Sequence, residues 1–333
     1  MKMKQLLLNV LNVQSESYDT TEMEKFIIND VNSLGLDVTY DNGNMYVTKG
    51  TGPYPCIVSH TDTVHKIIPQ EDYTIISNDE FAIGFNKAKM EPTGCGGDDK
   101  VGIYICLQLL RDMDNIKVAF FRDEEVGCNG SYDANVKFFD DVRFVLQCDR
   151  RGNSDFVNEI YGVQLQSKKF KKQSAKIIRK YGYKPTSGML TDVYALAQIG
   201  VEVSVANMSC GYYNPHSDDE TISFADVSNC LAMCYDIMIQ MTDTYPIQRE
   251  KVYNKPYYYS KPYKSYGSAW SDWDDWDSPY YSKPSYSKSK TSLDDDYTMC
   301  ESCTEIKNID DVRFSTEYNC NICADCSKEL AIY

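Results

Sequence analysis

Two patterns of apolar residues alternate along residues 1–245 and together predict an α/β domain. Continuous apolar runs, typical of strands covered on both faces, occur at 55–59, 116–121, 142–148 and 201–207. Apolar spacing of three and four residues predicts helices at 1–13, 100–113, 168–181 and 224–241. Another helix is expected from a capping box at Thr21-x-x-Glu24 to Gly35, followed by a hairpin that turns at Asn42-Gly43. We therefore expect a mixed, mostly parallel central sheet flanked by helices.

Polar side chains follow each of these predicted strands. They are His60 and Asp62 after the first strand, Glu124 and Glu125 after the second, Asp149 after the third, and His216 beyond the fourth. Sites in open α/β sheets lie outside the carboxyl ends of strands, so we expect these side chains to meet at one edge. With Asp98 from a glycine-rich loop, they form a nitrogen and oxygen ligand set suited to two zinc ions or other divalent metal ions. Two such ions can share a carboxylate and activate a water, which predicts hydrolysis.

Five segments carry a resemblance to a known family and occur in that family's order. They are SHTDTVH at 59–65, GCGGDDKVGI at 94–103, DEEVG at 123–127, CDRRG at 148–152 and GYYNPHSDDE at 211–220. Over about residues 1–245 the chain resembles the dinuclear zinc exopeptidases, which include peptidase T and the single-domain zinc aminopeptidases. The resemblance implies the zinc exopeptidase fold, of the phosphorylase and hydrolase type, and hydrolysis of peptide bonds.

The resemblance also implies a role for each metal ligand. It gives His60 and Asp149 to one zinc ion, Glu125 and His216 to the other, and Asp98 to both as a bridge. Taken alone, a histidine at a strand end or an acidic pair is more often structural or solvated, but five ordered segments favour a site.

Supporting roles follow from the same resemblance. Asp62 would orient the His60 ring, and Glu124 would be the general base. The peptide between Asp98 and Asp99 is a candidate for a cis bond, and Asp192 and Glu220 are expected to support the ligands. His65 matches no ligand position and is expected at the rim of the pocket or in a structural role.

The sequence indicates the type of reaction more clearly than it indicates the substrate. The interval from Asp149 to His216 is too short for a lid domain, so a single compact catalytic domain is expected. Arg150, Asn214 and either Tyr212 or Tyr213 are candidate substrate contacts. We favour an aminopeptidase or small-peptide hydrolase acting on a peptide or N-acyl amino acid. A carboxypeptidase, a zinc-dependent amidase or deacylase, and a catalytically silent binding protein are the alternatives.

Composition changes abruptly after the catalytic domain, for which we expect residues 1–248. Residues 249–297 are rich in Tyr, Ser, Lys, Trp and Asp, with almost no aliphatic side chains, which is typical of a flexible linker. Residues 298–333 contain C-x-x-C pairs that predict a zinc ribbon holding one structural zinc. The favoured ligands are Cys300, Cys303, Cys323 and Cys326, although Cys320 could replace one of the last two. The ribbon or the aromatic linker could bind a protein partner.

The overall charge of the chain limits the classes of molecule that it is expected to bind. Lys and Arg number 34 against 49 Asp and Glu, a formal net charge of -15, which argues against general binding of nucleic acid or anionic membranes. No apolar run is long enough to span a bilayer, and the N-terminal stretch lacks a small-residue cleavage site, so a cytoplasmic location is expected. The 13 cysteines are accordingly expected to be reduced thiols, some of them bound to metal.

Overall fold

The computed structural model describes residues 2–247 and four short strands at 297–299, 306–308, 312–315 and 320–323. The chain divides into two units, Met1–Tyr257 and Tyr258–Tyr333. No helix in the described residues is long and apolar enough to cross a membrane.

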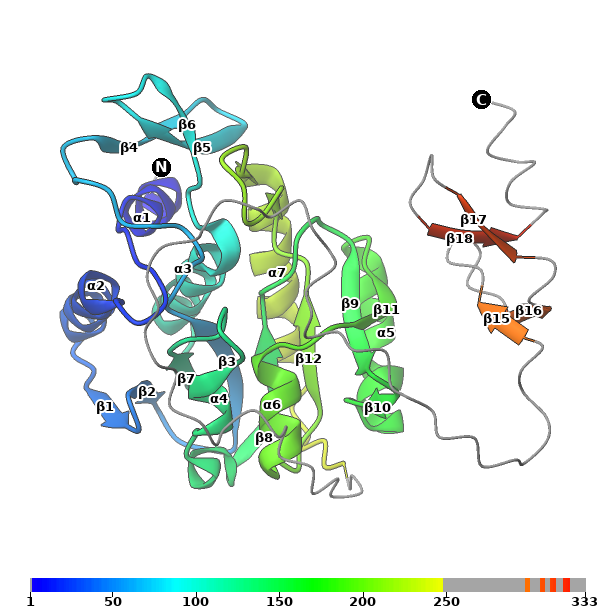
Figure 1. Ribbon diagram of the computed structural model, residues 1–333. Helices are drawn as coiled ribbons and strands as arrows, with labels where there is room; N and C mark the ends of the chain where they lie inside the picture. The colour runs from blue at the N-terminus through cyan, green and yellow to red at the C-terminus, as the bar shows by residue number, and fades with distance from the viewer. Residues whose placement is uncertain (1, 248–296, 300–305, 309–311, 316–319, 324–333) are drawn as a thin grey trace, which may run out of the picture. The chain divides into compact units, whose positions relative to one another are not determined.

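Helices and strands alternate through the first unit (Figure 1). Its helices are α1 (Lys2–Leu11), α2 (Thr21–Ser33), α3 (Gly97–Asp112), α4 (Asn129–Tyr132), the 3-10 helix η1 (Val136–Phe139), α5 (Lys168–Lys180), α6 (Asp192–Ile199) and α7 (Phe224–Gln240). Its strands are β1 (Val38–Asp41), β2 (Asn44–Lys49), β3 (Tyr54–His60), β4 (Tyr73–Ser77), β5 (Phe81–Asn86), β6 (Glu91–Thr93), β7 (Ile116–Phe121), β8 (Val142–Gln147), β9 (Asp155–Ile160), β10 (Val163–Gln164), β11 (Lys184–Gly188), β12 (Val205–Met208), β13 (Tyr212–Tyr213) and β14 (Thr221–Ser223).

A nine-stranded sheet forms the centre of this unit, in the order β1-β2-β7-β3-β8-β12-β9-β10, with β11 on the free side of β9. The central neighbours β7, β3, β8 and β12 are parallel. Strands β1 and β2 form the predicted hairpin, and β2 runs antiparallel to β7. The prediction of a mixed, mostly parallel sheet is therefore confirmed.

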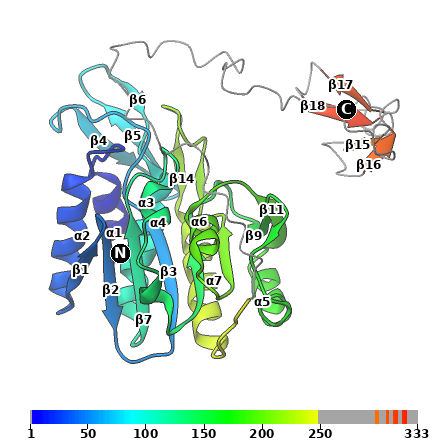
Figure 2. The ribbon, with the colours of Figure 1, turned by 60° about the horizontal axis from the view of Figure 1, so that its bottom comes forward.

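Two hydrophobic cores cover the two faces of this sheet. Side chains of α1, α2, α3, α5 and α7 pack into the larger core, and side chains of α6 pack into the smaller one. Figures 1 and 2 show these helices flanking the sheet. Alternation along β3 shows the division, because Ile57 lies in the larger core and its neighbours Cys56 and Val58 lie in the smaller one. Continuous apolar runs arise in these strands because both faces are buried.

A second, smaller sheet was absent from the sequence-based prediction. Strands β13, β14, β5 and β4 form it in that order, and β6 pairs with β5. Its segments are far apart in the chain, since β14 (Thr221–Ser223) pairs with β5 (Phe81–Asn86). This pairing brings the loop that carries His216 toward the glycine-rich loop that precedes α3.

Two local expectations need correction, and one helix was not expected. The strand expected at 201–207 is shorter and covers only Val205–Met208, while Val203 makes an isolated bridge to Pro246. The capping box at Thr21 is wrong, because Thr21 is already helical and Thr20 stands at the N-cap. The Thr20 hydroxyl donates instead to Glu24 Oε1 at 2.7 Å. Helix α6 was not predicted at all.

The second unit contains two antiparallel strand pairs. Strand β15 (Tyr297–Met299) pairs with β16 (Ile306–Asn308), and β17 (Val312–Ser315) pairs with β18 (Cys320–Cys323). The favoured zinc ligands Cys300, Cys303 and Cys326 lie outside the described residues. Cys323 ends β18, but its side chain is likewise outside the described part of the structure. The ribbon therefore stays a prediction.

Candidate metal centre

Three parallel strands deliver most of the predicted ligands to one edge of the central sheet. His60 is the last residue of β3, the Glu124-Glu125 pair follows β7, and Asp149 follows β8. Because β7, β3 and β8 are parallel neighbours, their carboxyl ends meet there. Asp98 comes from the first turn of α3, and the peptide between Asp98 and Asp99 is cis, as the resemblance implied.

The Asp98 carboxylate lies between the two histidines. Its Oδ1 is 3.2 Å from His60 Nε2, and its Oδ2 is 3.3 Å from His216 Nε2. Asp149 Oδ1 lies 3.7 Å from His60 Nε2, and Glu125 Oε2 lies 3.3 Å from His216 Nε2. The five predicted ligands thus form two groups that share Asp98, the arrangement needed for a bridging carboxylate.

Asp62 fixes both His60 and the loop after β7. His60 Nδ1 is 2.9 Å from the Asp62 carbonyl oxygen and 3.4 Å from Asp62 Oδ1. The carboxylate also accepts hydrogen bonds from the Glu124 backbone N–H at 2.9 Å and the Ser17 hydroxyl at 2.7 Å. With Nδ1 occupied in this way, His60 directs Nε2 toward Asp98 and Asp149.

Glu124 lies at the centre of the site but has little contact with donors. Its Oε2 is 4.0 Å from His60 Nε2, and its Oε1 accepts a weak hydrogen bond from the Cys128 thiol at 3.3 Å. Burial raises the pKa of Glu124 well above its usual value, and repulsion from Asp149 adds to this despite the opposing effect of His60. A raised pKa makes the carboxylate a stronger proton acceptor, which is the property that a general base needs.

The donor set fits divalent cations. Glu125 Oε1 is buried and has no hydrogen-bond partner within the described residues. Donor atoms of His60, Asp98 and Glu125 all lie within 4.8 Å of one another. Burial raises the pKa of Asp149 to about 8, with repulsion from Asp98 as the next cause. Cations would relieve this crowding of carboxylates, and imidazole with carboxylate ligands suits zinc and related metals.

A polar cluster holds Asp149; the sequence indicated Asp192 as a supporting residue and Tyr212 only as a candidate substrate contact, and it gave no role to Gln147 or Thr191. Gln147 Nε2 donates to Asp149 Oδ2 and to Asp192 Oδ2, both at 3.0 Å. The Thr191 hydroxyl lies 2.9 Å from Asp149 Oδ2, and the Tyr212 hydroxyl donates to Asp149 Oδ1 at 3.3 Å. One available signal was Gln147 itself, a polar amide directly after the apolar residues 144–146, and the structure buries it fully.

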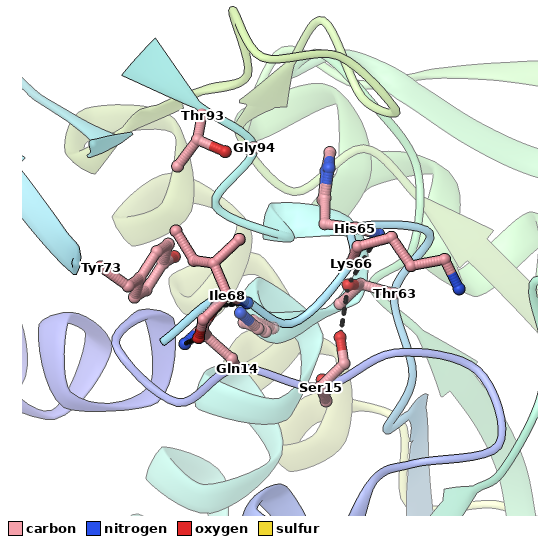
Figure 3. A pocket seen from close by; sticks show the side chains of 10 residues that line it. Gln14, Ser15, Thr63, His65, Lys66, Ile68, Tyr73, Thr93 and Gly94 are labelled. Carbon is pink, nitrogen blue, oxygen red and sulfur yellow. Dashed lines mark hydrogen bonds between the residues drawn. The ribbon is translucent and has the colours of Figure 1, made fainter. Parts of the chain in front are cut away.

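Glu220 holds the glycine-rich loop, and His65 contacts Glu220. The Glu220 carboxylate accepts hydrogen bonds from the backbone N–H groups of Gly96 at 2.6 Å and Asp98 at 3.2 Å. His65 Nε2 lies 3.2 Å from Glu220 Oε2, and its ring lines a small pocket with Thr63 and Gly94 (Figure 3). These contacts connect His65, through Glu220, to the backbone of Asp98, the predicted bridging ligand.

Two predicted substrate contacts have other partners in the structure. Arg150 Nε donates to Asp155 Oδ2 at 2.7 Å, and the Tyr213 hydroxyl donates to Asp226 Oδ2 at 2.7 Å. Asn214 lies in the loop before His216, where its amide is 3.4 Å from the Asp219 carbonyl oxygen. None of these described contacts joins the three residues to the ligand set.

Comparison with known proteins supports the fold. No family model matches the chain, and no curated protein matches it by sequence. Among solved structures, aminopeptidase PepT from Bacillus cereus is similar over 71% of this chain and 97% of its own, with a TM-score of 0.57 and 13% identity. A tripeptidase from Staphylococcus aureus is similar over 72% and 98%, with a TM-score of 0.58 and 14% identity. The TET1 peptidase of Pyrococcus horikoshii is similar over 71% and 99%, with a TM-score of 0.54 and 14% identity. The chain therefore has the fold of these peptidases.

Proposed function

We propose that the protein is a metal-dependent exopeptidase with two zinc ions, most simply an aminopeptidase or small-peptide hydrolase. The observation that carries this proposal is the position of Asp98, with one carboxylate oxygen toward each histidine. His60 and Asp149 would hold one ion, and Glu125 and His216 the other. The peptidase names of the structurally similar proteins agree with this reaction.

The chain's own residues supply the proton transfers. When bound, two divalent cations polarise a scissile carbonyl and lower the pKa of a water. Glu124 accepts the proton of the attacking water and passes it to the departing amine, and burial, which raises its pKa, lets it hold the proton between these steps. Asp62 keeps both His60 and the Glu124 backbone in position.

The direct test replaces the general base. We expect Glu124→Gln to lower kcat by about 10²- to 10⁴-fold while metal content per chain stays at the wild-type level. Glu71→Gln, the same change at an exposed carboxylate, is the matched control and should leave kcat unchanged. Wild-type turnover by Glu124→Gln would rule out the assigned base.

A substrate panel separates the alternatives within the same reaction class. Aminoacyl, carboxyl-terminal and N-acyl substrates should be assayed with and without a chelator. Turnover confined to aminoacyl peptides supports the aminopeptidase, and turnover confined to N-acyl amino acids identifies a deacylase. If no substrate shows chelator-sensitive turnover, the silent binding protein becomes the better hypothesis.

A further inference from the structure

Three large apolar side chains lie exposed beside one another near the candidate metal centre. Tyr161 is 64% exposed, Met189 is 72% exposed and Leu190 is 41% exposed. They adjoin because Ile160, at the end of β9, is paired with Gly188, at the end of β11. The Leu190 backbone N–H also donates to the Tyr161 hydroxyl at 3.3 Å. We call these three residues the apolar rim.

The apolar rim is connected directly to a predicted metal ligand. Leu190 is followed by Thr191, whose hydroxyl lies 2.9 Å from Asp149 Oδ2. The segment that exposes Met189 and Leu190 therefore continues into the residue that supports Asp149. The guanidinium of Arg150, which follows Asp149 directly, is paired with Asp155.

Contiguous exposed apolar side chains at the edge of a polar site are typical of ligand recognition. Single exposed apolar residues are ordinary on protein surfaces, whereas grouped ones mark interaction sites. Binding sites for small ligands combine apolar walls with a few polar groups that fix orientation. Here the polar groups are the candidate metal ligands and the apolar wall would be the rim.

We propose that the apolar rim receives an apolar side chain of the peptide, on one side of the bond that is cleaved. This rests on the proposed peptidase function and adds a substrate class to it. Short peptides with leucine-like or methionine-like residues at that position are then preferred over peptides with glycine or charged residues there.

The test compares tripeptides that differ at one position. The full-length, metal-loaded protein is assayed with five peptides: Leu-Gly-Gly, Gly-Leu-Gly, Asp-Gly-Gly, Lys-Gly-Gly and Gly-Gly-Gly. We expect kcat/KM for one of the two leucine peptides to exceed that for Gly-Gly-Gly by about 10-fold or more. Met189→Ser and Leu190→Ser should each lower this leucine-to-glycine ratio several-fold.

A matched control and a second measurement keep the outcomes distinct. Ile239→Ser removes another exposed apolar side chain, near the end of α7, and should leave the ratio unchanged. Three results would overturn the substrate class but not the peptidase function. They are a leucine-to-glycine ratio of kcat/KM near one, a ratio that neither rim variant changes, and a preference for the Asp or Lys peptide. Chelator-sensitive turnover of none of the peptides overturns both. Light scattering measures the oligomeric state of the same variants. If the rim variants dissociate an oligomer without changing the leucine-to-glycine ratio, the rim is a subunit contact and the proposal is overturned.

Discussion

His216 illustrates at the scale of one residue how protons and metal compete for the site. Its hydrogen bonds to Asp98 and then Glu125 raise its pKa to about 10, against a smaller opposing effect of burial. At neutral pH the ring is therefore protonated when only these carboxylates surround it. A metal ion requires the neutral ring, so binding must displace that proton.

Metal binding should accordingly release protons and strengthen with pH. As the pH rises toward about 10, the raised pKa of His216 means that less of the ring remains protonated, so apparent zinc affinity should increase. Calorimetric titration of the metal-free protein with zinc, in buffers of different ionisation enthalpy, measures the protons released. The variant His216→Gln should release fewer protons when zinc binds. Heats that do not depend on the buffer near neutral pH would contradict the raised pKa.

At the scale of elements, the beginning of α3 combines a structural and a chemical role. The Asp99 carboxylate accepts hydrogen bonds from the Ser59 hydroxyl at 2.5 Å and the Gly102 backbone N–H at 3.0 Å. It thereby joins α3 to the end of β3, where His60 lies. Gly102 has no room for a side chain, because a Cβ there would lie 2.3 Å from Asp99 Oδ1.

Gly102→Ala should therefore damage both the fold and the site. Overpacking of this kind costs about 1–3 kcal/mol of unfolding free energy, and displaced supporting groups weaken metal binding about 10- to 100-fold. Urea unfolding and zinc titration measure the two effects. Gly35→Ala is the control: a Cβ there meets open space, but the φ of +72° is unfavourable for alanine. It should lower stability without changing zinc affinity.

The elements also show what could be read from the sequence. Strands β3, β7 and β8 were predictable because burial on both faces leaves continuous apolar runs, and their polar successors located His60, Glu124 and Asp149. The small sheet was missed because its strands are short, and because the pairing that joins its two parts, β14 with β5, spans more than half of the first unit. The Asp149 supports were missed for a similar reason, since Thr191 and Tyr212 reach it only through tertiary structure.

At the scale of the whole molecule, all residues of the candidate metal centre belong to the first unit, Met1–Tyr257. The cysteine pairs of the predicted ribbon belong to the second unit, Tyr258–Tyr333. If each unit binds its own metal ions, deletion of the second unit should leave metal binding and hydrolysis by the first unit unchanged.

Deletion of residues 298–333 should remove about one zinc per chain and leave hydrolysis intact. Mass spectrometric metal analysis and the tripeptide assay measure the two results on the same preparation. Replacing Cys300 and Cys303 with serine in the full-length chain should cause the same loss of zinc. Loss of turnover in a truncated protein that remains folded would make the second unit part of the active enzyme.

The outer strands of the nine-stranded sheet limit how copies of the chain can associate. Strand β11 forms one border, and its first two residues are the exposed Lys184 and Pro185. Proline offers no N–H to an incoming strand, and a charged lysine opposes its approach, so this border resists lateral strand addition and aggregation. The opposite border, β1, is only four residues long. Copies of this unit would therefore meet through side-chain surfaces rather than by extending the sheet.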